Sequence, residues 1–244
     1  MHKTILIILV LWLFYQPGDS ATLSGIRTDV RDLVQDTDTN GFRWSSVTLN
    51  SRINSAQNLI AAMSRCVSSA TYITTNATNR EYLLPADFLM PKRASYLVTG
   101  TTFYKVLEPT DRIVLDRIAT WEYSTRGVPA RYYIDYQVTG SSNFVIGLDP
   151  FCTTVSSGVN ALRVEYYATV PAMSADSDEP FNSADFLSVY HTAIMWYVAA
   201  WCKYDDKLYT EAEMFRKNFI DELQILINNI QSKPGWNPIF PSYK

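Results

Sequence analysis

The residues with the clearest spacing for chemistry lie between Leu33 and Asn50, in the stretch LVQDTDTNGFRWSSVTLN. An EF-hand loop needs oxygen ligands at its first, third and fifth positions, a glycine at the sixth and a bidentate glutamate at the twelfth. The first four of these are present: Asp36, Asp38, Asn40 and Gly41. The twelfth position is Val47, which cannot coordinate a cation. Because Asp, Asn and Gly also favour turns, the spacing indicates a turn between two helices and argues against a calcium site.

Pairs of carboxylates are a second source of chemistry, since a glycosidase needs only two. The candidates are Asp116 with Glu122, Asp149 near a strand end, and Asp205 with Asp206 at an expected helix start. Adjacent aspartates at a helix start are favoured by the helix dipole alone. The acidic run Asp176 to Glu179 could bind a cation, but a solvated connector has the same composition. We therefore predict no catalytic residue, no metal site and no cofactor.

Nucleophilic and phosphate-binding motifs are not found. The chain has two histidines, His2 and His191, and none of the motifs HExxH, GxGxxG, GxSxG or the P-loop. The three cysteines are widely and irregularly spaced, which favours buried free thiols over a zinc site or a disulfide framework: Cys66, Cys152 and Cys202. The formal net charge of -3 gives no basic footprint for wholesale binding of nucleic acid.

Helical periodicity at the N-terminal side predicts helices over residues 24–35 and 46–67. In the second of these, Leu49, Ile53 and Ile60 recur at intervals of three and four, with Ser45 or Ser46 available as the cap. The two helices form a hairpin, with the Asp36 to Arg43 stretch as its link.

The middle of the chain, residues 70–170, has the alternation of β-strands. The runs YYIDYQV and NFVIGL are joined by a short turn that begins with glycine, which predicts a β-hairpin. LRVEYYA repeats the alternation, and the runs REYLL, SYLVTG, TFYKVL and RIVLD are expected to be short strands broken by Pro85, Pro91 and Pro109. An antiparallel sheet or small sandwich of six to eight strands is expected.

The C-terminal part predicts two further helices, over 184–202 and 206–231, and then a proline-rich tail over 232–244 that cannot be helical. The predicted fold class is therefore α+β: an N-terminal helical hairpin and a C-terminal helix pair form a small helical bundle, a central antiparallel sheet or sandwich separates them in sequence, and an extended tail follows. The main domain is expected to span residues 21–231.

Residues 1–20 have a basic start, an apolar run from Ile5 to Tyr15, and small residues before Ala21. This layout is typical of a secretory signal peptide. A start codon assigned too early, or an extension whose apolar run is buried against a neighbouring subunit, would also explain it.

Aromatic residues are abundant, with 16 Tyr, 11 Phe and 6 Trp. Core packing explains many of them, but Tyr and Trp are also enriched at protein interfaces. Together with the aromatic tail, this composition favours an interaction protein.

Several segments, in order from Thr22 to Ile230, resemble the head-to-tail adaptor (head-completion or connector) proteins of tailed bacteriophages. They are TLSGIRTDVRDLVQD, RWSSVTLNSRINSAQNLIA, GVPARYYID, FVIGLDP, LRVEYYATVPAMSADSDEP and YHTAIMWYVAAWCKYDDKLYTEAEMFRKNFIDEL. The resemblance implies a structural virion protein without enzymatic activity. Such adaptors form a ring, usually of twelve copies, that docks to the portal protein in the neck, extends the DNA channel and offers a platform for tail or nozzle proteins. DNA would be only non-specific cargo, and assembly would take place in the host cytoplasm.

The resemblance also implies that the C-terminal tail docks onto the portal. The anchors would be Trp236, Ile239, Phe240 and Tyr243. The alternatives are an exported, non-enzymatic binding domain with a cleaved signal peptide, and an exported hydrolase that uses an Asp/Glu pair.

Overall fold

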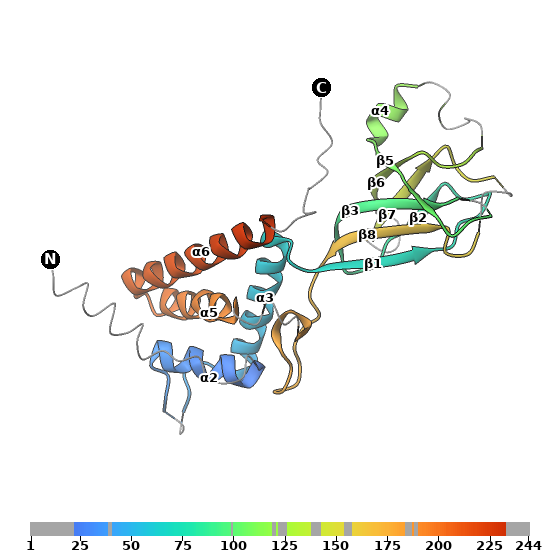
Figure 1. Cartoon of the computed structure of the whole chain (residues 1–244). Coiled ribbons are helices and arrows are strands. Elements are labelled where there is room, and N and C mark those ends of the chain that lie inside the picture. Colours follow the sequence, from blue (N-terminus) through green and yellow to red (C-terminus); the bar gives the residue numbers. More distant parts are fainter. Residues whose placement is uncertain are drawn as a thin grey trace. The chain divides into compact units, whose positions relative to one another are not determined.

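A computed structural model describes residues 22–38, 41–98, 100–118, 121, 126–137, 143–153, 158–183, 187 and 190–232. The chain divides into two compact units. The helical unit is drawn from Met1–Ile60 and Pro171–Leu226, and the β-unit from Ala61–Val170 and Ile227–Lys244. The predicted α+β class is confirmed (Figure 1).

The N-terminal helical hairpin forms as expected, with α2 at Leu23–Val34 and α3 at Ser46–Ser64. Thr22 caps α2 by accepting a hydrogen bond from the Gly25 backbone N–H at 3.2 Å. Gln35 ends α2 in a left-handed conformation, with φ of 63°. Helix α3 ends at Ser64, three residues before its expected end, because Arg65 takes a positive φ of 55° and cannot continue the helix.

The C-terminal helices are α5 at His191–Asp205 and α6 at Tyr209–Gln231, after a 3₁₀ turn η2 at Pro180–Ser183. They lie side by side (Figure 1) and join through aromatic pairs: Trp196 stacks on Phe215 with ring centroids 5.6 Å apart, and Tyr197 meets Phe219 at 5.3 Å. Helix α2 packs against α5. The hairpin and the helix pair therefore form one helical bundle.

The prediction that Asp205 and Asp206 open a helix is wrong. Asp205 is the last residue of α5, and Asp206 is its C-cap, with a backbone N–H that bonds to the carbonyl of Cys202. Lys207 has a positive φ of 62°, so the helix stops there. The Asp206 carboxylate forms an ion pair with Arg43, which compensates a negative charge at the unfavourable end of the helix dipole.

Two amide side chains of α3 bind the segment that returns from the β-unit. Asn54 Oδ1 accepts a hydrogen bond from Met173 N at 2.8 Å, and Asn54 Nδ2 donates to the Met173 carbonyl at 3.0 Å. Gln57, fully buried, donates to the Pro171 carbonyl at 3.0 Å and accepts from the Phe181 N–H at 3.3 Å. These bonds fix the path of the returning chain across α3.

The β-unit contains two four-stranded sheets, in the orders β1-β8-β3-β4 and β2-β7-β6-β5. The strands are β1 Ser68–Ile73, β2 Glu81–Leu83, β3 Phe88–Leu97, β4 Tyr104–Val106, β5 Glu108–Pro109, β6 Arg131–Gln137, β7 Asn143–Asp149 and β8 Leu162–Ala168. Residues of both sheets share one apolar core, among them Tyr96, Ile146, Leu148, Leu162 and Val164. The expected sandwich and the β6–β7 hairpin, with Ile134 opposite Ile146, are thereby confirmed.

Two local predictions in this region are wrong. The RIVLD run is a short helix, α4 at Arg112–Asp116, because the Asp111 side chain accepts a hydrogen bond from the Ile113 N–H at 2.9 Å and caps it. Pro91 does not break its strand but lies within β3 at a register shift. It is tolerated because β3 pairs with β4 only over Ser95–Leu97, so no ladder hydrogen bond is needed there.

Gly147 in β7 leaves room for an aromatic ring. Its cross-strand partner is Tyr133 of β6, which is 1% exposed and meets Trp121 edge to face at 5.9 Å. A Cβ atom on Gly147 would overlap the Tyr133 ring itself.

We therefore expect Gly147→Ala to lower the free energy of unfolding of the β-unit by about 1 to 3 kcal/mol, because the added methyl group displaces a packed ring. Urea unfolding followed by aromatic fluorescence measures the change. Gly41→Ala is the matched control, since no atom lies within 4 Å of the Cβ added there. Equal stability of the two variants would contradict the packing described for Tyr133.

Candidate assembly surface

The EF-hand-like stretch forms a turn in which Asp36 bonds the backbone. Its Oδ1 accepts from the Arg43 N–H at 2.8 Å and its Oδ2 from the Trp44 N–H at 3.1 Å. The Asp36 side chain is nearly buried, so both carboxylate oxygens are used inside the turn. Asn40 lies outside the described residues. Among the residues described, no cluster of His, Cys, Asp and Glu could hold a metal ion.

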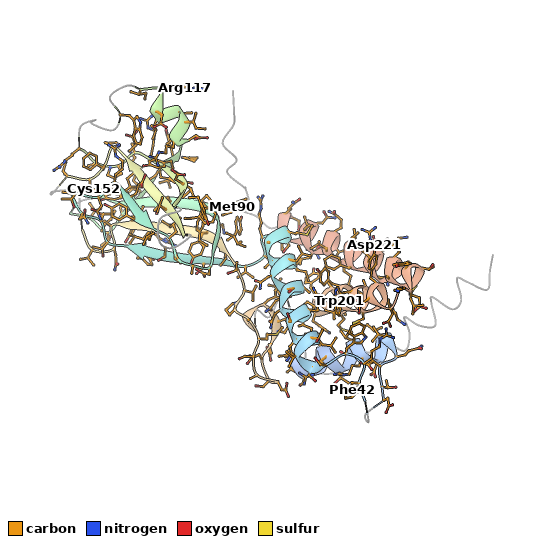
Figure 2. The ribbon with its side chains drawn as sticks, turned by 180° about the vertical axis from the view of Figure 1, so that it is seen from behind. Phe42, Met90, Arg117, Cys152, Trp201 and Asp221 are labelled. Atoms are coloured by element: carbon orange, nitrogen blue, oxygen red, sulfur yellow. The ribbon has the colours of Figure 1, made fainter. Side chains whose placement is uncertain are left out.

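Cationic and aromatic side chains anchor this turn to the helices. Arg31 is buried, lies 3.8 Å from the centre of the Phe42 ring, and donates to the Trp44 carbonyl at 2.9 Å. Trp44 meets Trp201 of α5 with centroids 5.0 Å apart, and Arg52 lies over the Trp201 ring. Figure 2 shows Phe42 on the loop after α2 and Trp201 among the side chains between the helices. Phe42 remains 43% exposed, so the anchored turn presents an aromatic ring to solvent.

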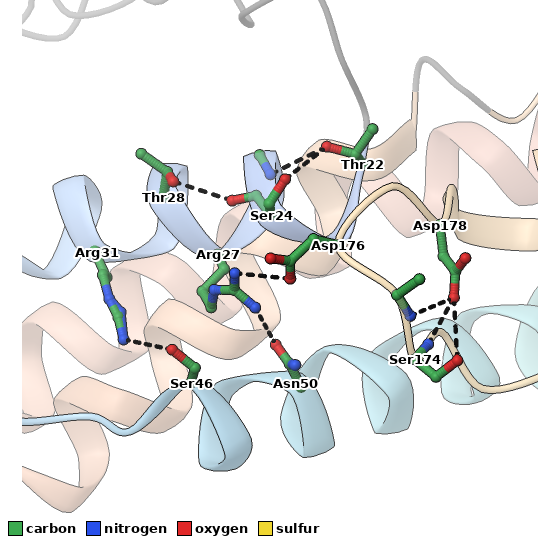
Figure 3. Close-up of polar contacts among 12 residues, drawn as sticks. Thr22, Ser24, Arg27, Thr28, Arg31, Ser46, Asn50, Ser174, Asp176 and Asp178 are labelled. Atoms are coloured by element: carbon green, nitrogen blue, oxygen red, sulfur yellow. Dashed lines mark hydrogen bonds and ion pairs between the residues drawn. The ribbon is translucent and has the colours of Figure 1, made fainter.

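The acidic connector is an ordered turn held against α2 and α3 (Figure 3). Arg27 bridges Asp176 at 2.9 Å and Asn50 at 3.0 Å. The Asp178 carboxylate accepts hydrogen bonds from the Ser174 and Ala175 N–H groups at 2.7 and 2.8 Å. These backbone bonds lower the pKa of Asp178 below its usual value of 3.8. One oxygen of Asp178 thus bonds the turn itself, and one oxygen of Asp176 bonds the turn to α2.

The other carboxylates suggested by the sequence also have structural partners. Asp149 at the end of β7 is 5% exposed and pairs with Arg131, its cross-strand neighbour, at 2.6 Å. Asp116 accepts a hydrogen bond from the Trp121 indole N–H at 2.8 Å. Its proposed partner Glu122 lies outside the described residues. These bonds hold strands and loops together.

The histidine and the thiols are placed as structural groups. His191 is buried at the start of α5. Burial raises the pKa of Asp29 in α2, and the coulombic effect of His191 opposes that rise. All three cysteines are free; Cys152 and Cys202 are buried as expected, whereas Cys66 is only half-buried. Burial, reinforced by Asp206, raises the pKa of the Cys202 thiol to about 12. It therefore stays protonated and unreactive near neutral pH.

A polar network ties α4 to the β-sheet beneath it. Arg112 donates to Asp135 at 2.5 Å and approaches Glu81 at 3.4 Å, and the Tyr133 hydroxyl donates to Glu81 at 2.8 Å. Burial and the Glu81 carboxylate raise the pKa of Tyr133. A hollow of about 350 Å³ opens beside Glu81 and is lined by Asn79, Arg80, Glu81, Leu83 and Val145. Glu81 at this hollow already accepts hydrogen bonds from Arg112 and Tyr133.

The apolar side chains in α4 and just after it are in part buried and in part exposed. Leu115 is buried with Trp121 and Tyr133. Ile113, Val114 and Ile118 are 64%, 49% and 46% exposed. We call these three residues the α4 patch. Adjacent exposed aliphatic side chains mark a surface suited to contact with another protein, and sequence reasoning missed the patch because it treated RIVLD as a strand.

The aromatic residues divide between core and surface. Tyr82, Tyr96, Tyr132, Tyr133, Tyr166 and Tyr167 are buried in the β-unit, as core packing requires. The large exposed rings are those of Phe42, Tyr72, Phe103, Tyr136, Phe144, Tyr204 and Tyr209. Core packing accounts for the buried rings, and the interface interpretation of the exposed rings stays a prediction. The predicted tail anchors Trp236, Ile239, Phe240 and Tyr243 lie outside the described residues.

A family model described as SU10 adaptor protein matches residues 21–238, most of the chain. A search of curated proteins found no match to the chain. In the described part of the chain, no helix is both long and apolar enough to cross a membrane.

We expect Asp36→Ala to lower the free energy of unfolding by about 1 to 3 kcal/mol, because two backbone N–H groups, one of them in a buried bond, lose a charged acceptor. The melting temperature of the variant measures this loss. Asp38→Ala, at an exposed position of the same loop, is the control and should cost less. Calcium should leave the melting temperature of the native protein unchanged, and a rise on adding calcium would contradict the turn interpretation.

The lowered pKa of Asp178 predicts a specific pH dependence. Its stabilising effect is complete above the unfolded value of 3.8 and disappears as the pH falls through the lower folded value. The urea midpoints of the native protein and of Asp178→Asn should therefore differ at neutral pH and converge in acid below 3.8. A difference that persisted unchanged into strong acid would show that the ionised carboxylate is not its source.

Proposed function

The chain belongs to the SU10 adaptor protein family, a family of phage head-to-tail adaptors, and on that premise we propose that it is a ring-forming structural protein of the virion neck. The observation that carries this proposal is the family match, which spans both the helical unit and the β-unit. In this role the protein docks under the portal after assembly in the host cytoplasm, extends the DNA channel and supports the tail or nozzle proteins.

The chemistry of the described residues supports a structural role. Asp36, Asp149 and Asp178 all bind backbone N–H groups or an arginine of the same unit. Enzymes instead keep titratable groups with displaced pKa values available at a cleft. Polar groups that stabilise turns and strands are what a rigid building block of an assembly requires.

Exposed apolar surface supports assembly with other copies. A cyclic ring needs two different complementary surfaces on each subunit. Apolar surface is available on both units: the α4 patch on the β-unit, and Phe42, Tyr204, Leu208 and Tyr209 on the helical unit. We propose that such surfaces are covered when the ring, of twelve copies in the usual adaptor arrangement, closes.

The segment 232–244 would be the portal-docking element, with residues 21–231 as the adaptor domain. Trp236, Ile239, Phe240 and Tyr243 supply large apolar side chains between prolines. A segment that orders only on binding loses its conformational entropy at that step, which suits assembly in a fixed sequence. DNA would be only non-specific cargo in the channel, consistent with a net charge of -3 that gives no basic footprint for wholesale binding of nucleic acid.

The tail is tested by deletion. Removing Lys233–Lys244 should leave the melting temperature within a few degrees of the native value and abolish binding to the purified portal, measured by co-sedimentation. Replacing the four anchors by Ala should have the same effect, whereas Asn237→Ala with Ser242→Ala should not. Full portal binding by the truncated protein would exclude the tail as the docking element.

Peptide mass spectrometry of purified particles, with the cell-free supernatant beside them, tests the function as a whole. Copy numbers equal to those of the portal would support a neck protein. Presence only in the particle-free supernatant, with an N-terminus near Ala21, would instead indicate the exported binding domain and overturn the proposal.

A further inference from the structure

Strand β1 forms an outer edge of its sheet and differs from the other three edge strands. Natural sheets protect their edges by making them short or by placing charges or proline there. Strands β2, β4 and β5 have three, three and two residues and contain Glu81, Lys105, and Glu108 with Pro109, respectively. Strand β1, SSATYI, has six residues with no charge and no proline. Among the described strands it is therefore the unprotected edge.

The hydrogen-bonding groups that β1 leaves unused follow from its pairing with β8. The Ala168 N–H bonds to the Val67 carbonyl at 3.1 Å, just before β1 begins. Because backbone groups alternate sides along an antiparallel strand, Ser69, Thr71 and Ile73 face β8. The N–H and C=O groups of Ser68, Ala70 and Tyr72 then point away from β8, toward the open edge, where no described strand is paired.

The side chains along this edge suit another strand. Ser68 and Ala70 are small and exposed, and Tyr72 is 50% exposed. The nearest charges on the same face are Arg163 and Glu165 of β8, which pair with each other at 2.9 Å. Strand β1 thus carries neither steric bulk at its centre nor a charged side chain of its own to repel an approaching strand.

We infer that β1 is a pairing site for β1 of a second copy of this chain. The two strands would run antiparallel about a two-fold axis at Ala70, so that Ala70 faces Ala70 and Tyr72 faces Ser68. Each large ring then lies opposite a small side chain, and every outward N–H finds an outward C=O. An uncharged centre matters most for self-pairing, because any charge on a two-fold axis meets its own copy.

A second copy fits this edge better than the chain's own C-terminal segment. Pro238 and Pro241 lie three residues apart, so one of them faces the edge in either alternation of an extended strand. A proline there offers no N–H to the ladder. Strand β1 of another copy has no such gap.

This contact goes beyond the proposed ring and does not depend on it. A two-fold contact uses the same surface on both partners and is closed, whereas a ring needs two different surfaces. Edge pairing of single strands buries little area and belongs to the weak, transient class of interfaces. It would therefore appear as a reversible dimer of the free protein at high concentration.

Opposite charges at Ala70 test the pairing. In Ala70→Lys and in Ala70→Glu, like charges face each other across the axis, and each variant alone should dimerise at least tenfold more weakly than the native chain. An equimolar mixture of the two should restore dimers, because Lys then faces Glu. Sedimentation velocity of the full chain over a wide concentration range measures all three. Val159→Lys, at a 76% exposed position outside the strands, is the control and should leave dimerisation unchanged.

Three other outcomes would each overturn the proposal. A native chain that stays monomeric up to about millimolar concentration would show that β1 does not self-pair. Failure of the mixture to recover, with circular dichroism confirming that both variants are folded, would place the contact elsewhere. Loss of dimers on deletion of Lys233–Lys244, with Ala70→Lys and Ala70→Glu equally weak in the mixture, would identify the tail as the occupant of the edge.

Discussion

The helical unit depends on the two amides of α3 that bind the returning chain. In sequence the β-unit lies between the two halves of the helical bundle, so the chain must return across α3 before it reaches α5 and α6. Asn54 and Gln57 meet Met173 and Pro171, which lie 119 and 114 residues further on. An unpaired buried amide costs about 1 to 3 kcal/mol, so these side chains strongly favour one path for the return.

Hydrogen bonding within the fold also accounts for the aspartates whose spacing suggested catalysis or metal binding. A carboxylate next to free N–H groups is stabilised by them, and Asp36 and Asp178 each accept two backbone bonds. Asp149 is stabilised by Arg131 across the hairpin. In Asp36 these bonds occupy both carboxylate oxygens. The surface also exposes apolar side chains, as in the α4 patch, and such surface favours contacts with other proteins.

The two kinds of contact proposed here have different physical bases. The proposed ring closure and portal docking would rest on side chains, those of the exposed apolar residues and of the aromatic tail. The β1 contact rests on backbone groups, whose direction follows from the β1–β8 register. Pairing of β1 in the free protein would leave the apolar core of the β-unit unchanged, because Ser68, Ala70 and Tyr72 lie outside that core.

The sequence by itself determined the elements whose signals are local: the helical hairpin, the β6–β7 hairpin and the α+β class follow from periodicity over a few turns or strands. It also placed Asp36 in a turn, because Asp and Gly act on their own backbone. It failed at RIVLD, where β-branched residues favour a strand but the Asp111 cap and the burial of Leu115 give a helix. Only the tertiary structure decided the partners of Asn54 and Gln57, the α4 patch and the open edge of β1. Those features depend on residues distant in sequence, and periodicity carries no information about which distant segments meet.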